Sequence, residues 1–198
     1  MPQMTRTFVA VPVPSKLGEK LAHLQSLLTE ECPGVSWVPP VHFHLTLAFL
    51  GDVENTDLDA VCRAVAGASA AFGPLELRLE GLGTFPAPEK PRVFWVGLTG
   101  PDLPRLMDLQ KAVAAAVKAA GYAPDDRFHP HVTLGRRKPG KGPPLDVRPQ
   151  VRHYQKWAAG SMRVAEVVTF ASTLSPAGPR YDPLARVVLE AATPPGPP

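Results

Sequence analysis

Residues 42–47 read HFHLTL, and residues 129–134 read HPHVTL. The two stretches hold four of the six histidines in the chain, and each contains a His-x-Thr unit followed by an apolar residue. Because side chains alternate between the two faces of a strand, His44 and Thr46 are expected to point to one face and the leucines beside them to the other. The second stretch repeats this arrangement, so both are predicted to be strands with a polar face toward a cleft and an apolar face toward the core.

The two stretches occupy equivalent places in a longer pattern. Phe8 lies as far before His44 as Phe94 lies before His131, to within one residue. Each segment begins with an apolar strand, continues with a helical pattern and a proline-rich turn, and ends in the histidine strand. Matching order together with matching spacing is typical of a duplicated unit.

The repeat units are predicted at approximately 6–52 and 92–136. Duplication predicts two lobes related by an approximate two-fold axis, with both histidine strands close to that axis. Residues 1–192 are therefore expected to form a single bilobal domain, and residues 193–198, which are rich in proline, are expected to form a flexible tail.

Hydrophobic periodicity places the other elements of the chain. Ser15 is expected to cap the first helix, and Gly121 is expected to end the third helix in the left-handed conformation that glycine adopts easily. The predicted elements, in order, are a strand at 6–14, a helix at 15–32, a helix within 55–72, a strand from about 75, a strand at 92–98, a helix within 101–122 and strands at 165–174 and 184–191. Residues 175–183 are predicted to form the connector between the last two strands.

Composition bounds the class of protein. A hydrophobic content of 44% is ample for a packed core. No apolar run is long enough to span a membrane, and the N-terminus lacks the pattern of a signal peptide. Cys32 and Cys62 are isolated from one another, without metal-site spacing, so reduced thiols and a cytoplasmic location are expected.

Charge gives a modest indication of the partner. The chain has a net charge of +3 and a pI near 9.0. A basic balance favours an anionic partner, although so small an excess is common in proteins that bind no nucleic acid.

Two histidines that face each other across a cleft are suited to acid–base chemistry. A neutral imidazole removes a proton from a nucleophile, and a protonated imidazole delivers a proton to a leaving oxygen. The hydroxyls of Thr46 and Thr133 are suited to donate hydrogen bonds to an anion held between His44 and His131. A phosphodiester fits such a site, and the arrangement requires no metal or other cofactor.

These motifs resemble those of a known family. HLTLAFLG at 44–51 and HVTL at 131–134 are similar to the two His-x-Thr-x signatures of the two-histidine (2H) phosphoesterases. The surrounding sequence resembles the bacterial and archaeal RNA 2′,3′-cyclic phosphodiesterases, also named 2′-5′ RNA ligases, from Arg6 to about Leu189. One His-x-Thr-x is common by chance, whereas two at equivalent points of a duplication are specific.

The resemblance implies a fold and a reaction. The implied fold is α+β and bilobal, with two antiparallel sheets, helices on the outside and a central cleft on the pseudo-two-fold axis. The implied reaction opens a terminal RNA 2′,3′-cyclic phosphate to a 2′-phosphate, in some members with 2′-5′ ligation. The implied partner is therefore RNA with a cyclic phosphate end; no obligatory protein partner is inferred.

The resemblance also implies roles for five residues. His44 would be the proton donor to the departing 3′ oxygen, and His131 the proton acceptor that activates water. Thr46 and Thr133 would bind the substrate phosphate, as would Arg136, which matches an arginine of the family. The residues alone do not distinguish the acid from the base.

Three other functions stay open at this point. A related enzyme would act on a small nucleotide-derived cyclic phosphate, and a non-catalytic module would only bind RNA. A metal-dependent enzyme would use His42 and His129, which share a predicted face with His44 and His131, although no carboxylate completes such a site.

Residues near the motifs have several candidate roles. The basic loop at 137–142 is suited to grip RNA phosphates, but a solvated loop explains it equally well. Phe128 and Trp95 are candidates to stack a base. Phe49 has odd parity relative to His44 and is expected in the core. Tyr181 receives no role.

The composition predicts thermal stability. Proline occurs 25 times and asparagine once, at Asn55, and stiff loops with few thermolabile residues are thermophile habits. We therefore expect a melting temperature above about 65 °C, the upper end of the usual mesophile range. Calorimetry of the purified chain checks this, and a transition within the mesophile range would refute thermophily.

Overall fold

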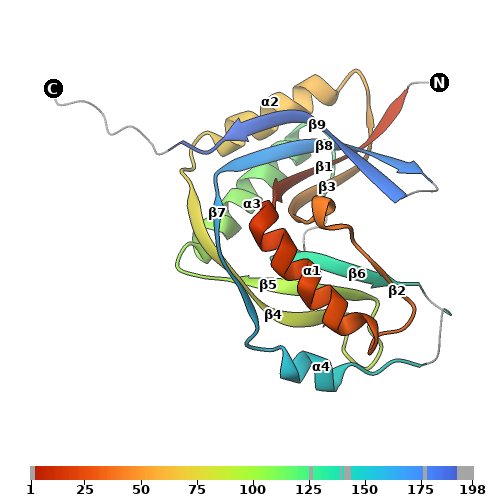
Figure 1. Cartoon of the computed structure of the whole chain (residues 1–198). Coiled ribbons are helices and arrows are strands. Elements are labelled where there is room, and N and C mark those ends of the chain that lie inside the picture. Colours follow the sequence, from red (N-terminus) through yellow and green to blue (C-terminus); the bar gives the residue numbers. More distant parts are fainter. Residues whose placement is uncertain (1–2, 125–126, 139, 141–143, 176–177, 191–198) are drawn as a thin grey trace.

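The structure is a computed structural model of the chain, and it describes residues 3–124, 127–138, 140, 144–175 and 178–190 (Figure 1). The proposed tail at 193–198 lies outside these residues. The strands are β1 (Met4–Pro12), β2 (Val35–Trp37), β3 (His44–Glu54), β4 (Leu75–Phe85), β5 (Val93–Thr99), β6 (His131–Arg137), β7 (Ala158–Val164), β8 (Glu166–Ser175) and β9 (Gly178–Val188). The helices are α1 (Ser15–Thr29), α2 (Leu58–Ser69), α3 (Leu103–Ala119) and α4 (Arg148–His153), with a short 3-10 turn η1 (Pro40–His42).

The strands form one curled antiparallel sheet in the order β7-β4-β5-β6-β3-β1-β8-β9, with β2 beside β6. The predicted α+β class is confirmed. The two predicted sheets are two halves of this sheet, which join where Leu45 of β3 pairs with Val132 of β6. Both side chains are fully buried, and β3 and β6 pair at this one position before each continues along its own half.

Strand order is symmetrical about the junction between β3 and β6. β4 follows α2 in the chain but pairs with β5, in the second half of the sheet. β8, near the end of the chain, pairs with β1 in the first half. The second half of the sheet therefore contains β4, from the first part of the chain, and the first half contains β8, from the last part. The duplication predicts this symmetry; the boundaries of the repeat units stay a prediction.

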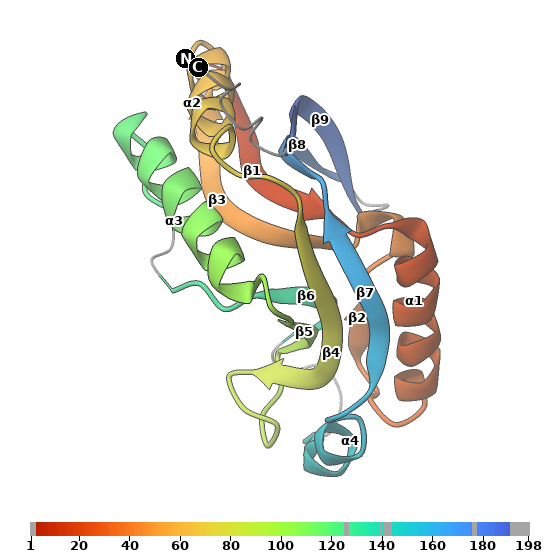
Figure 2. The same cartoon turned by 90° about the vertical axis from the view of Figure 1, so that its left-hand side faces the viewer.

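Helices flank the sheet on opposite sides. Figure 2 shows α1 on one flank and α2 with α3 on the other. α1 buries the predicted leucine stripe, Leu17, Leu21, Leu24 and Leu28, and contacts β7 in the second half. α3 contacts β3 in the first half. α1 follows β1 of the first half but contacts the second half, and α3 follows β5 of the second half but contacts the first.

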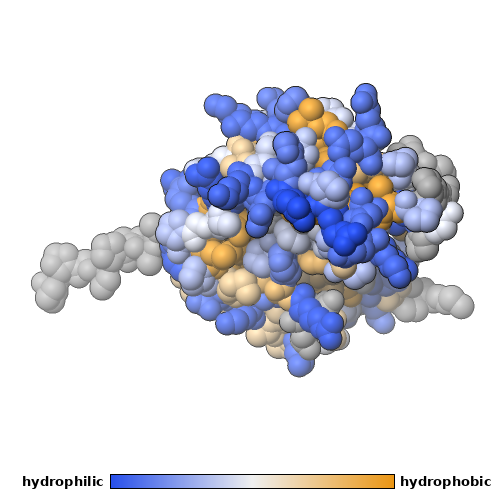
Figure 3. Space-filling view, turned by 90° about the horizontal axis from the view of Figure 1, so that it is seen from below, coloured by the Kyte–Doolittle hydropathy of each residue, from blue (hydrophilic) through white to orange (hydrophobic). Residues whose placement is uncertain are grey.

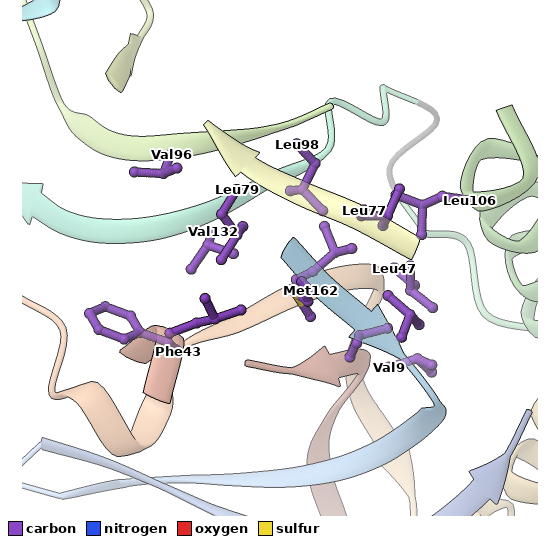
Figure 4. Close-up of a cluster of buried hydrophobic side chains, with 14 of the residues drawn as sticks. Val9, Phe43, Leu47, Leu77, Leu79, Val96, Leu98, Leu106, Val132 and Met162 are labelled. Carbon is purple, nitrogen blue, oxygen red and sulfur yellow. The ribbon is translucent and has the colours of Figure 1, made fainter. Parts of the chain in front are cut away.

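The core is shared by both halves of the sheet. Figure 4 shows Leu47 from β3, Val132 from β6 and Met162 from β7 among side chains of one buried cluster. Hydrophilic side chains, by contrast, cover most of the face seen in Figure 3, with small hydrophobic patches between them. A common core holds the two halves at a fixed distance, as a cleft between them requires.

Several elements differ from the sequence-based prediction. Ser15 is the first residue of α1, not its cap, and the carbonyl of Pro14 accepts hydrogen bonds from the first turn. β2, α4 and β7 were not predicted. β2 is too short to show periodicity, α4 begins beside a proline, and β7 is rich in small residues with low strand propensity.

The predicted connector at 175–183 is largely strand. β9 begins at Gly178 and contains Pro179 and Pro183, residues that normally argue against a strand. The strand tolerates them because β9 is the edge of the sheet, where one row of backbone groups needs no partner.

The pairing of β3 with β1 is interrupted at two places, and one of them directly follows the His-x-Thr unit. Ala10 pairs with Thr46, whereas the preceding Val9 pairs with Ala48. Leu47 is therefore the extra residue of a β-bulge, directly after the threonine of the His-x-Thr unit. A bulge shifts the alternation of side chains by one residue and bends the strand.

β6 carries the same irregularity at the equivalent position. Its pairing with β5 skips Leu134, the residue after Thr133. Past each bulge, residues of odd parity relative to the histidine turn to the cleft face. Phe49 on β3 and Arg136 on β6 are such residues, and both line the cleft. The predicted core location of Phe49 is therefore wrong, and its side chain is 42% exposed.

Two buried glutamines bind the carbonyls of the bulge residues. Nε2 of Gln110, on α3, donates to the carbonyl oxygen of Leu47 at 3.2 Å. Nε2 of Gln25, on α1, donates to the carbonyl oxygens of Leu134 at 2.8 Å and Val38 at 2.9 Å. Both glutamines are buried. Gln110 thus gives the carbonyl of Leu47 a donor from α3. Gln25 ties the carbonyl of Val38 to that of Leu134, which also accepts from the backbone N–H of Val38 at 2.8 Å.

We predict that Gln25→Met and Gln110→Met each destabilise the fold. Methionine has a similar length and no donor, so the carbonyl of Leu47 in one variant and that of Val38 in the other loses a hydrogen bond, at a cost of about 1–3 kcal/mol. Denaturant unfolding checks this, with Gln155→Met, an exposed glutamine, as the matched control. Equal stability of all three variants and the parent would show that the bulges need no support from the helices.

Candidate active site

A cleft of about 730 Å³ lies where the two halves of the sheet meet. All five residues predicted to form the site line it. They are His44 and Thr46 on β3, and His131, Thr133 and Arg136 on β6. Residues predicted from two distant segments of the chain are thus brought together.

The strand register at the junction sets the relative positions of these side chains. Leu45 lies opposite Val132, and the strands are antiparallel. The polar side chains of the two His-x-Thr units stand directly before and after this pair on each strand, and all four line the cleft.

A main-chain carbonyl fixes each histidine ring. Nδ1 of His44 lies 2.7 Å from the carbonyl oxygen of His42, and Nδ1 of His131 lies 2.7 Å from the carbonyl oxygen of His129. Because a carbonyl accepts only, Nδ1 carries the hydrogen in both rings and donates it. Nε2 of each neutral ring is then the basic nitrogen that is left for a ligand.

Burial lowers the pKa of both histidines below its usual range. For His44 the positive charges of Arg136, His42 and His131 add to this effect, while the hydrogen bond to the carbonyl of His42 opposes it. For His131 the charges of His129 and Arg136 act in the same direction as burial. Both rings are therefore predominantly neutral at pH 7 when no anion is bound.

The cleft offers donors for an anion. Thr46 and Thr133 are half-buried in it, and within the described part of the chain neither hydroxyl has a hydrogen-bond partner. The exposed guanidinium of Arg136 faces the same space. Two hydroxyls and a guanidinium around two imidazoles form a donor set suited to a phosphate group.

Aromatic rings enclose both histidines. The ring centroid of His44 lies 5.0 Å from that of Phe8 and 5.5 Å from that of Tyr181. The ring of His131 lies 5.2 Å from Phe85, edge to face. Tyr181 was missed as a site residue because it was placed in a connector, whereas β9 brings it into the cleft.

Comparison with known proteins places this site in a family. The family model described as LigT like Phosphoesterase matches residues 11–95 and 98–181. The chain belongs to the LigT-like phosphoesterase family. This confirms the predicted family, and the protein is a hydrolase of that class.

Curated relatives agree with this assignment. A protein of Methanothermobacter thermautotrophicus is 33% identical over 89% of this chain and 94% of its own length. A protein of Archaeoglobus fulgidus is 35% identical over 90% of this chain and 97% of its own length. Both are named RNA 2′,3′-cyclic phosphodiesterase.

Solved structures share the fold. A protein of Thermus thermophilus superposes with a TM-score of 0.78 at 28% identity, over 95% of this chain and all of its own. LigT of E. coli in complex with 3′-AMP gives a TM-score of 0.73 at 26% identity, over 94% and 99% of the two chains.

His42 and His129 contact the site of this LigT-like phosphoesterase through their backbones, and the ring of His42 also lines the cleft, 4.7 Å from that of Tyr181. Their carbonyls orient His44 and His131, and the ring of His129 packs against Trp95 at 4.8 Å. Among the residues that the structure describes, no three His, Cys, Asp or Glu side chains are grouped to hold a metal ion. Likewise, no helix within the described ranges is long and apolar enough to cross a membrane.

The remaining candidates lie away from the cleft. Arg137 and Lys138, from the basic loop, line a separate hollow with Lys90 and Arg92, and Lys141 lies outside the described residues. Trp95 packs on Gly83, where a Cβ atom would lie 2.2 Å from the indole. Phe128 packs against the core. None of these side chains lines the cleft, so the cleft gives no support to Trp95 or Phe128 as a stacking residue.

We predict that Arg136→Met raises the pKa of both His44 and His131. Arg136 places a positive charge near both rings, which disfavours their protonated forms, so its removal moves both values up toward about 6.5. NMR titration of the imidazole signals checks this. Arg63→Met, on the exposed face of α2, is the control and leaves both values in place; unchanged titrations in Arg136→Met would remove Arg136 from the site.

Proposed function

We propose that this enzyme hydrolyses the 2′,3′-cyclic phosphate at the end of an RNA chain to a 2′-phosphate. The observation that carries the proposal is the paired orientation of His44 and His131, whose Nδ1 atoms are held by carbonyls and whose Nε2 atoms serve one cleft. The names of the relatives from Methanothermobacter and Archaeoglobus support the same substrate.

The phosphate binds between the two strands. Thr46 and Thr133 donate hydrogen bonds to its non-bridging oxygens, and Arg136 supplies a positive charge. These donors are already in place before the reaction, so they stabilise the extra negative charge of the transition state without rearrangement.

Proton transfer follows from the state of the rings. Neutral His131 accepts a proton at Nε2 from water, whose oxygen forms a bond to phosphorus. The bond from phosphorus to the 3′ oxygen breaks, and protonated His44 delivers its Nε2 proton to that oxygen. The phosphate stays on the 2′ oxygen. This mechanism uses side chains alone.

The bound anion supplies the protonation state that His44 needs. Burial and Arg136 keep its pKa low in the free enzyme. A phosphate between the strands places a negative charge beside the imidazole and raises its pKa again. Substrate binding therefore creates the acid, while His131 remains the base toward water.

Ligation uses the same geometry. If the 5′-hydroxyl of a second RNA end replaces water, His131 takes its proton and the product is a 2′-5′ linkage. We place this chemistry in the cytoplasm, where RNA ends arise and where free thiols such as Cys32 and Cys62 persist.

We expect an RNA oligomer ending in a 2′,3′-cyclic phosphate to be converted, in EDTA, to a product with a 2′-phosphate. Phosphorus NMR of the product identifies the oxygen that keeps the phosphate. Activity that appears only after a divalent metal is added would replace this mechanism with a metal-dependent one. Tight RNA binding that survives in a His44→Ala, His131→Ala double variant, without turnover in the parent, would make the protein a binding module.

Either single change, His44→Ala or His131→Ala, is predicted to lower kcat/KM by about 10²–10⁴, the usual contribution of a general acid or base. His153→Ala, an exposed histidine on α4, is the matched control and retains activity. A loss below about tenfold for both site variants would contradict the paired-histidine mechanism.

A further inference from the structure

We propose that Arg6, seated on the ring of Phe49, binds a second phosphate, the one on the 5′ side of the terminal nucleoside. The cleft would then select the ends of RNA chains over isolated nucleoside cyclic phosphates. This inference rests on the proposed function and names the substrate class more closely. Neither the family signatures nor the names of the relatives assign a role to Arg6.

The guanidinium of Arg6 has a fixed place in the cleft. Its central carbon lies 4.8 Å from the centroid of the Phe49 ring, a cation–π contact that orients the group. Both residues line the same cleft as His44 and Thr46. Stacking leaves the in-plane N–H groups of the guanidinium free to donate to an anion.

Arg6 also lacks a competing carboxylate. Asp52 lies opposite it in the register of β1 and β3, yet the two side chains form no ion pair, and among the described residues no other carboxylate pairs with Arg6. Arg180, on nearby β9, is by contrast held by Asp182 at 2.9 Å. An unpaired arginine at the wall of a cleft is suited to an anionic ligand.

The position of Phe49 relates Arg6 to Arg136. Phe49 follows His44 as Arg136 follows His131, and an equivalent bulge turns each into the cleft. At this equivalent position β6 has Arg136, whereas β3 has Phe49. The ring of Phe49 in turn contacts the guanidinium of Arg6, on the neighbouring strand β1. β3 and β6 run antiparallel from their junction, so Phe49 and Arg136 lie on opposite sides of it.

The two arginines differ in their effect on the histidines. The charge of Arg136 lowers the pKa of His44 and His131, so Arg136 serves the reacting phosphate. Arg6 is not among the causes of these two shifts; at Tyr181, Arg136 and, to a smaller extent, Arg6 both oppose the rise in pKa that burial causes. Arg6, stacked on Phe49 at the same cleft, is thus left for an anion other than the reacting phosphate.

The direction of the RNA chain follows from the chemistry. His44 protonates the 3′ oxygen, so the terminal ribose lies on the β3 side of the phosphate. The rest of the chain leaves that ribose through its 5′ oxygen, and its next phosphate lies farther along the same half of the sheet. Arg6, Phe49 and Tyr181 line this half.

The experiment compares three substrates with the same reacting group. They are a nucleoside 2′,3′-cyclic phosphate, its 5′-phosphorylated form and a dinucleotide with the same terminal nucleoside. In Arg6→Gln, the ratio of kcat/KM for the dinucleotide to that for the nucleoside is expected to fall about 3- to 10-fold, the loss of one partly exposed charged contact. Arg6→Lys recovers part of the ratio, and Arg63→Gln, on α2, leaves the ratio at the parent value.

The substrates distinguish the source of the second phosphate. A fall for both phosphate-bearing substrates supports recognition of any 5′ phosphate, and a fall for the dinucleotide alone supports recognition of a phosphodiester within a chain. Equal losses for all three substrates, or no loss, would overturn the proposal. Unchanged melting of Arg6→Gln shows that the variant is folded.

Binding measurements keep the test independent of turnover. Calorimetry compares the affinity of a deoxydinucleotide with a terminal 3′-phosphate against that of a deoxynucleoside 3′-phosphate, in the parent and in Arg6→Gln. A parent without hydrolysis but with an affinity ratio that depends on Arg6 would refute the proposed function and support the second phosphate site. An affinity ratio that is the same in the parent and in Arg6→Gln would overturn the second phosphate site, even if the enzyme is active.

Discussion

Two hydrogen bonds between helix side chains and strand carbonyls determine the shape of the cleft. The amides of Gln25 and Gln110 bind the carbonyls of Leu134 and Leu47, the extra residues of the two bulges. Each amide stabilises the bulged arrangement over regular pairing of the strand, and at Leu134 the backbone N–H of Val38 adds a second hydrogen bond. Regular pairing would restore the alternation of side chains and turn Arg136 away from the histidines. The positive end of the site thus depends on amides that never contact the substrate.

This dependence explains which parts of the site the sequence predicted. His-x-Thr spacing is a strand pattern, and it correctly placed His44 and Thr46 on one face because both precede the bulge. The same parity rule failed at Phe49, beyond the bulge. A signal was present nevertheless: LAHLQSLL at 21–28 and LMDLQKAV at 106–113 place a glutamine at the same point of an apolar helical stripe. A polar residue repeated within two core stripes indicates a buried carbonyl that needs a donor.

Other parts of the site gave no signal in the sequence. The carbonyls of His42 and His129 orient the rings of His44 and His131, and any residue type supplies a carbonyl. Tyr181 reaches His44 because β9 forms a strand despite its two prolines. The strand tolerates these prolines because it lies at the edge of the sheet. Likewise, the two predicted sheets are joined into one by a single pair, Leu45 with Val132. The sequence did not indicate this pairing, because periodicity describes each strand by itself and not which strands are neighbours.

The cleft is nearly symmetrical around His44 and His131, whereas the proposed reaction needs the two histidines to play different roles. Each histidine ring bonds the carbonyl of the residue two before it and has a lowered pKa, so symmetry supplies two similar candidates for proton transfer. A reaction with a distinct leaving group and nucleophile requires unequal surroundings for them. The two halves differ at equivalent positions that line the cleft: β6 has Arg136 there, and β3 has Phe49. The ring of Phe49 contacts Arg6, so the positive charge on this side comes from another strand. An RNA end has the same polarity, with a reacting phosphate at its terminus and a ribose and further phosphate behind it. Under the proposed function, Phe49, the residue that departs from the internal repeat, would set the direction of the substrate and, through it, the roles of two otherwise equivalent histidines.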